Sequence, residues 1–505
     1  MSVRWALPGL VVLAGCGAGA AAAAATAISQ VEPRPFTFGA MAIGQARDLD
    51  HARAEGLGLV PASPLDGYLD GVLRRLLARS PVSDVPARVY VRASSEWSAK
   101  STADAHIFVS LGILLRLDSE DEVAALLAHE AAHVILGHAN SDAVQAAQQR
   151  ALQLSGMALD AQRALAEATG GRTPAGDGQT IAGVGTDEQS RALLLNSTLL
   201  SPAWTRGQER EADRLGADLL VRADYAPQAM VGLLEKQKAF ETKRAANPQA
   251  ADLDRRLLGV DVTEKGQRKA TETAAAKVGG AGGELLGALA GAALGKSKEW
   301  AVKQVDEGSR SHPKTSERIA DVQAYLQGEY ADLASPAPRV RRWEEAKESD
   351  GTVDVLENYI AAIEARDKLG DGDVAAAARF AKAGLMAPTQ AHAYPNYVEA
   401  SVRLAAGDGA GALADYEAAL AGPEPAGAIY TGASTLLMAS GQRDQAVQVL
   451  ESGYSRLQEP PSLTVPLIRS YRQAGRQADA QRLAKQCALR WPTLQALCSG
   501  EAGGP

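Results

Sequence analysis

The sequence predicts a mainly α-helical protein with a small β-sheet in its first domain and an α-solenoid of helix pairs in its second. Aromatic residues make up only 5% of the 505 residues, while Ala and Gly are abundant, which favours closely packed helices over a β-sandwich. β-Prone runs are few: residues 88–92 alternate polar and apolar side chains, and 107–115 is expected to form the partner strand and lead into a helix. The C-terminal part instead repeats Gly and Ala every 34 residues, which predicts stacked helix pairs.

Length and charge restrict the classes of protein. A chain of 505 residues is too long for one compact core, so we expect separate domains over 38–335 and 350–498. Hydrophobic residues make up 46% and charged residues 22%, a balance typical of globular proteins. The net charge is −8 without a strongly basic domain. We therefore expect no nucleic-acid partner, because phosphate binding needs clustered Lys and Arg.

The first residues have the features of an export signal. Arg4 precedes an apolar stretch that is too short to span a bilayer. The stretch ends in Leu-Ala-Gly-Cys at residues 13–16, which resembles the bacterial lipoprotein box. The resemblance implies removal of residues 1–15, acylation of Cys16, a linker over 16–37 and attachment to the outer membrane. The alternative is an ordinary signal peptide cleaved within the alanine run 20–25.

Both alternatives place the mature chain in the periplasm, outside the cytoplasm, where disulfides persist. Cys487 and Cys498 are the remaining thiols. They form either one bridge or two buried free thiols, because sequence spacing does not decide between these states.

The first domain is expected to contain two helices within 38–80, then the two strands, then a buried helix. Acidic residues at 118–122 mark the start of that helix and Gly137 marks its end. Two insertions are predicted, at about 140–200 and 262–300. The second carries Gly every four residues, which indicates either a helix-packing surface or a surface for membrane or unfolded substrate.

The buried helix carries the sequence His129-Glu130-Ala131-Ala132-His133. Side chains four residues apart lie on one face of a helix, so both imidazoles can bind one zinc ion. Glu130 lies beside them and can take a proton from a metal-bound water. The alternative is a pair of hydrogen-bonded core histidines. The surrounding helix is apolar, however, and burial of these groups is costly without a metal or other partners.

A second helix, around residues 208–216, carries acidic groups that match this motif. At about 100° per residue, Glu209 and Asp213 share a face with small and apolar residues, whereas Glu211 points away. We therefore predict Glu209 as the third zinc ligand. Asp213 is predicted to accept a hydrogen bond from a ligand imidazole. The alternative is a buried salt bridge from these carboxylates to an Arg.

H-E-x-x-H followed by E-x-x-A-D resembles the metallopeptidase family of the CAAX prenyl proteases and the HtpX heat-shock protease. The resemblance implies a gluzincin-like fold with one Zn²⁺ per chain. It also implies that residues 106–114 form an edge strand along which substrate lies. Ser311-His312-Pro313 with Arg318-Ile319 resembles the family element H-P-x-x-x-x-R-I. His312 is thus expected to regulate access to the zinc or stabilise the transition state, or else only to cap a helix.

The C-terminal period rests on Gly407, Gly441 and Gly475 and on alanines that recur at the same interval, Ala412, Ala446 and Ala480. It resembles the tetratricopeptide repeat, with Gly in the turn between helices and a small residue where they touch. About four repeats are expected. Such repeats build a concave surface that binds extended or helical partners.

Together these features predict a zinc endopeptidase of the bacterial envelope, similar to the periplasmic, repeat-carrying branch of the family. Its expected substrates are misfolded or stalled envelope proteins, and its repeats are expected to bind substrate or the outer-membrane assembly machinery. The alternative is a chaperone or scaffold lipoprotein whose protease site is self-inhibited or vestigial.

Overall fold

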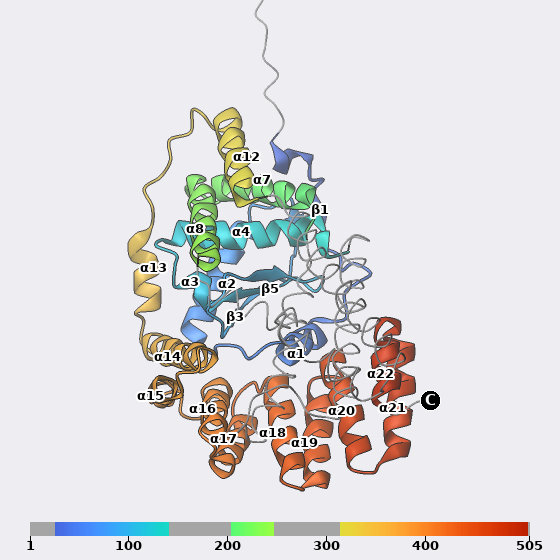
Figure 1. The fold of residues 1–505 in the computed structure, drawn as a ribbon. Coiled ribbons are helices and arrows are strands. Elements are labelled where there is room, and N and C mark those ends of the chain that lie inside the picture. The colour runs from blue at the N-terminus through green and yellow to red at the C-terminus, as the bar shows by residue number, and fades with distance from the viewer. Residues whose placement is uncertain (1–25, 141–203, 247–313, 503–505) are drawn as a thin grey trace, which may run out of the picture.

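The computed structural model describes residues 26–140, 204–246 and 314–502, which Figure 1 shows as a helical domain above a curved row of helix pairs. The predicted fold class is confirmed, since helices dominate and the strands form small sheets. Residues 1–16, the predicted insertions beyond residue 140 and His312 lie outside the described residues. Among the described helices, none combines the length and hydropathy needed to span a membrane.

The larger sheet has three strands in the order β3-β5-β4. β3 (Arg88–Arg92) and β5 (His106–Ser110) are parallel, and the alternating Val89 and Val91 are buried opposite Ile107 and Val109. β4 (Ala99–Ser101) pairs antiparallel with the other side of β5. β5 is therefore the central strand and not the edge strand that the family resemblance implied; the two edges of the sheet are β3 and β4.

α4 (Glu120–Leu136) is the buried helix expected from the sequence. The Ser119 side chain caps its start by accepting a hydrogen bond from the Glu122 amide. Gly137 ends the helix at φ 67°, a left-handed conformation that glycine adopts without steric cost. α4 packs against α2 (Ser63–Leu77) and the sheet, and also against α7 (Arg206–Arg222) and α8 (Gln228–Ala245). α12 (Thr315–Glu329) covers α7 and α8 (Figure 1).

The predicted linker over 16–37 is corrected from residue 26 onward, because this part of the chain is packed on the first domain. The short helix η1 (Ala27–Gln30) lies against α7. The Ala27 and Ile28 amides donate to the Tyr325 hydroxyl and to the Asp218 carboxylate, each at 2.8 Å. β1 (Arg34–Pro35) then pairs with β2 (Val82–Ser83). These acceptors are far away in the sequence, so composition alone did not reveal them.

The C-terminal domain consists of four helix pairs and a last helix within the described residues. The pairs are α14 (Val353–Gly370) with α15 (Val374–Gly384), α16 (Ala393–Ala405) with α17 (Gly409–Ala421), α18 (Gly427–Ala439) with α19 (Arg443–Arg456), and α20 (Pro461–Gln473) with α21 (Gln477–Arg490), followed by α22 (Gln495–Glu501). Each periodic glycine lies in the turn within a pair at φ 77–84°, and each periodic alanine is fully buried where the helices meet. Cys487 and Cys498 form a disulfide between α21 and α22, which decides between the two predicted states.

The two domains share packed surfaces. α1 (Gln45–Glu55) lies against α18 and α20, and a Cβ atom on Gly427 would come within 2.2 Å of the Ala54 carbonyl oxygen. α13 (Val340–Lys347) leads from α12 to the repeats and buries Trp343 against α2 and α4. Tyr359 of α14 belongs to the same hydrophobic core as α4.

Candidate metal centre

His129 and His133 lie one turn apart on α4, and their Nε2 atoms are 3.2 Å from each other. Glu209 reaches them from α7, with Oε2 at 3.6 Å from His129 Nε2. All three side chains are buried, and one ligand atom from each lies within 4.8 Å of the others. Two nitrogens bound tetrahedrally to one zinc at about 2.0–2.1 Å would be roughly 3.3 Å apart. The donor atoms therefore fit a zinc ion.

Close packing of α4 and α7 brings the third donor into range. A Cβ atom on Gly216 would lie 3.2 Å from the His129 amide nitrogen, so only a glycine lets the helices approach this closely without displacement. Glu209 lies two turns before Gly216, on the same buried face. Glu211 points away, and its side chain is 65% exposed. The face predicted from the helical geometry is confirmed.

Asp213 contacts both a candidate ligand and a cation. Its Oδ1 lies 3.0 Å from His129 Nδ1, an ion-pair distance, but Nδ1 makes no hydrogen bond among the described residues because the angle is unsuitable. A carboxylate at this position favours a proton on Nδ1, which leaves the Nε2 lone pair for a metal. Arg318 of α12 donates to both carboxylate oxygens, at 2.8 and 2.6 Å. The alternative salt bridge is thus present, whereas the predicted hydrogen bond is reduced to a close approach of Asp213 to the imidazole. Although burial raises it, Arg318 brings the pKa of Asp213 down to about 2.

Arg318 also lies 3.0 Å from Glu209 Oε2, so one guanidinium joins both carboxylates of α7. The sequence contained a signal for this residue, because Arg318 is the arginine of the H-P-x-x-x-x-R-I element. The prediction emphasised the histidine of that element. His312 lies outside the described residues, and the described part of the element reaches the site through Arg318.

His133 is held by residues that the sequence did not connect with it. Its Nδ1 lies 2.8 Å from His138 Nδ1, and His138 Nε2 lies 3.2 Å from Glu211 Oε2. Trp204 stacks on the His133 ring at 4.3 Å between centroids. An unbroken helix would have placed His138 on the far side of α4, but the left-handed Gly137 turns the chain back. Burial and the neighbouring His129, His138 and Arg318 lower the pKa of His133 well below its ordinary value, which favours the neutral, metal-binding imidazole.

Glu130 is buried beside this group of donors, with 4% of its surface exposed. Its Oε2 has no hydrogen-bond partner among the described residues. Burial raises the pKa of Glu130 to about 7, and Glu209 acts in the same direction against the opposing effect of His129. A carboxyl group that titrates near neutral pH can both accept and donate a proton in a reaction.

Comparison with known proteins agrees with this geometry. A sequence model of peptidase family M48 matches residues 64–326, more than half of the chain. This range includes the motif on α4, the acidic helix α7 and Arg318.

Individual relatives are more distant. The mitochondrial metalloendopeptidase OMA1 of Schizosaccharomyces pombe is 30% identical over 179 residues, which cover 35% of this chain and 45% of the relative. The β-barrel assembly-enhancing protease of Yersinia pestis is 27% identical over 172 residues, 34% of this chain and 32% of the relative. A putative β-barrel assembly-enhancing protease of Vibrio cholerae is 24% identical over 204 residues, 40% and 39%. The matched regions thus span less than half the length of each of these three relatives.

Proposed function

Since the chain belongs to peptidase family M48, we propose that it is a zinc-dependent endopeptidase with one zinc ion per chain. The ligands are His129, His133 and Glu209. The observation that carries this proposal is the convergence of their donor atoms within 4.8 Å in a buried site, next to the unpartnered carboxyl oxygen of Glu130. Two imidazoles and one carboxylate are a donor set typical of catalytic zinc, which keeps one position for water or substrate.

When bound, zinc would polarise the scissile carbonyl group and acidify the attacking water. Glu130 takes the proton of that water and then gives it to the leaving amine. Asp213 holds the proton on His129 Nδ1, and Arg318 fixes the two α7 carboxylates. By the family resemblance, His312 adds transition-state stabilisation or controls access.

The proposed setting is the periplasm of a bacterium, with a lipid anchor on Cys16 in the outer membrane. The substrates are misfolded or stalled outer-membrane proteins, and the repeats bind these substrates or the assembly machinery. The likeness to two proteins named β-barrel assembly-enhancing protease supports the substrate class. The Cys487–Cys498 disulfide supports a compartment outside the cytoplasm.

Glu130→Gln tests the mechanism because it keeps the shape of the side chain and removes its base. We expect one zinc per chain in both proteins, by metal analysis, and cleavage of casein or an unfolded outer-membrane protein by the wild type alone. Glu317→Gln, at an exposed position of α12, is the matched control and should retain full activity. Full activity of Glu130→Gln would refute the mechanism. Zinc binding without cleavage by the wild type would instead support the chaperone or scaffold alternative.

A further inference from the structure

A pocket of about 210 Å³ lies directly beside His133. Its walls come from residues 34–39 of the N-terminal segment, from Thr102 and Ala103 after β4, and from the end of α4 with the following turn. Sites for whole small molecules usually measure about 300–1,000 Å³, so this pocket is suited to a single side chain. His133 belongs both to the pocket wall and to the candidate metal centre.

Hydrogen bonds fix the N-terminal wall at both ends. The Phe36 amide donates to the Ser83 carbonyl at 2.8 Å, and the Arg34 guanidinium donates to the Ile135 carbonyl at 3.2 Å. Further along, the Ile43 and Gly44 amides donate to the buried Asp104 carboxylate at 2.9 and 2.8 Å. Residues 34–44 are thus tied to the sheet and to the zinc helix.

The lining of the pocket combines apolar side chains, among them Phe36, Ala103 and Val134, with the polar Arg34, Thr37 and Asn140. Phe36 is half-buried at the pocket and packs edge-to-face on Phe38, with ring centroids 5.2 Å apart. Phe38 is 51% exposed, so the aromatic pair extends from the pocket to the solvent. Large exposed apolar groups close together mark binding surfaces in soluble proteins. Across the pocket, Ala103 and Val134 leave room for a guest side chain.

The position of the pocket connects it to the path of a substrate. Of the two edge strands of the sheet, β4 contacts α4, and it ends at Ser101, directly before Thr102 and Ala103 of the pocket wall. A peptide that reaches His133 along this edge therefore passes the pocket. The side chain that enters the pocket must therefore belong to a substrate residue close to the scissile peptide bond.

We propose that residues 34–39 form the wall of a specificity pocket that binds one apolar side chain of an unfolded polypeptide next to the scissile bond. This inference rests on the proposed peptidase function. Folded proteins bury most such side chains, whereas unfolded chains expose them. The pocket thereby directs cleavage to unfolded segments, and Phe36 and Ala103 are its specificity-determining residues.

The test uses the full-length, zinc-loaded chain and a peptide library that varies one residue at a time around the cleaved bond. We expect the wild type to prefer Leu or Phe over Ala or Asp at one adjacent position by at least about tenfold in kcat/KM, since one or more methylene groups in a pocket give such ratios. Ala103→Leu fills the pocket and should shift the preference at that position to Ala. Phe36→Ala removes the wall and should weaken the preference for apolar residues.

Zinc content and circular dichroism verify that each variant is loaded and folded, and Ala103→Val replaces Ala103→Leu if the larger side chain prevents folding. Leu489→Ala, at a position 84% exposed in the repeat domain, is the control for loss of an apolar side chain and should leave the preference unchanged. If the wild type cleaves with a preference that neither pocket variant changes, the pocket proposal is overturned while the peptidase function stands. If the zinc-loaded wild type cleaves no peptide, both are overturned.

Discussion

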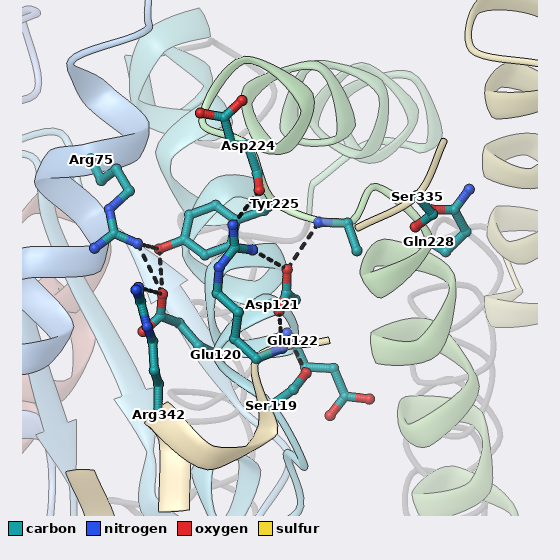
Figure 2. Close-up of polar contacts among 12 residues, drawn as sticks. Arg75, Ser119, Glu120, Asp121, Glu122, Asp224, Tyr225, Gln228, Ser335 and Arg342 are labelled. Carbon is teal, nitrogen blue, oxygen red and sulfur yellow. Dashed lines mark hydrogen bonds and ion pairs between the residues drawn. The ribbon is translucent and has the colours of Figure 1, made fainter. Parts of the chain in front are cut away.

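The two ends of α4 bury acidic groups in different ways. At the N-terminal end, Glu120 and Asp121 are 2% and 1% exposed and are surrounded by donors (Figure 2). Glu120 accepts hydrogen bonds from Tyr68, Arg75 and Tyr225, and Asp121 accepts from the Ala226 and Arg339 amides and the Arg339 guanidinium. Toward the other end, Glu130 keeps one oxygen without a hydrogen bond among the described residues. Glu209 Oε2 likewise has no hydrogen bond there and makes ion-pair contacts with Arg318 and His129.

This difference separates a structural polar cluster from a candidate catalytic one. Although burial raises it, the hydrogen bonds from Tyr68, Arg75 and Tyr225 bring the pKa of Glu120 below its ordinary value. Burial raises the pKa of Glu130, by contrast, to about 7. A fully bonded buried carboxylate stabilises the fold, whereas an incompletely bonded one is tolerated where a ligand supplies the missing partner. The N-terminal end of α4 is thus complete among the described residues, whereas the histidine end leaves positions that the proposed metal and substrate would fill.

Arg318→Ala should have the largest effect, because it leaves Asp213 and Glu209 buried without their cation. We expect the free energy of unfolding of the metal-free protein to fall by about 3–5 kcal/mol. Zinc should raise the free energy of unfolding more in the variant than in the wild type. In the variant the ion replaces Arg318 as the cation beside Glu209. Urea unfolding in EDTA and in zinc measures both quantities.

The control for this prediction is Arg210→Ala. Its ion pair with Asp321 joins the same two helices, but its side chains are 48% and 40% exposed. Such a surface pair contributes at most about 1 kcal/mol. Equal losses for Arg318→Ala and Arg210→Ala would show that the buried carboxylates at the histidine end of α4 do not depend on the charge of Arg318.

Arg339→Ala tests the opposite end of α4 and should cost about 2–3 kcal/mol, since charged hydrogen bonds to Asp121 are lost. The loss should be the same in EDTA and in zinc, because no metal completes this cluster. Arg341→Ala is the matched control: its side chain is 90% exposed and its pair with Glu345 lies on the surface. A zinc-dependent loss for Arg339→Ala would contradict the distinction between the two ends.

The features predicted from sequence are those that act locally. Ser119 and Gly137 set the ends of α4 through its own backbone, and the helical repeat of α7 selected Glu209 over Glu211. The glycine turns of the repeats follow from φ values that favour glycine. Each depends on residues within one helix or turn.

The features that sequence did not predict depend on distant segments or on one turn. Arg318 is 105 residues from Asp213, so helical geometry on α7 allowed a salt bridge to an Arg as an alternative but did not identify which Arg forms it. His138 approaches His133 only because Gly137 reverses the chain. Residues 26–37 belong to the predicted linker, and their packing depends on distant acceptors such as Asp218.

In the metal-free protein, the free energy of unfolding should depend on pH through Glu130 at the histidine end of α4. The folded pKa of Glu130, about 7, lies above its unfolded value near 4.5, so the folded state binds this proton more tightly. Protonated Glu130 therefore adds fully to the free energy of unfolding below pH 4.5. As the pH rises to about 7, roughly 2–3 kcal/mol of this free energy is lost. Urea unfolding in EDTA at pH 5 and pH 8 should show this loss in the wild type and a smaller one in Glu130→Gln. Identical losses would mean that Glu130 does not hold a proton in the buried site.

The smallest effect concerns single hydroxyl groups. Tyr68→Phe removes one donor, 2.9 Å from Glu120 Oε2, and should cost about 1 kcal/mol, because Arg75 and Tyr225 still bind that carboxylate. Tyr394 is the contrasting position: it is 1% exposed, and its hydroxyl has no hydrogen-bond partner among the described residues. Tyr394→Phe should therefore leave the free energy of unfolding unchanged or raise it. Equal losses in the two variants would show that hydrogen bonding does not determine how buried polar groups stabilise this protein, and the contrast between the two ends of α4 would lose its physical basis.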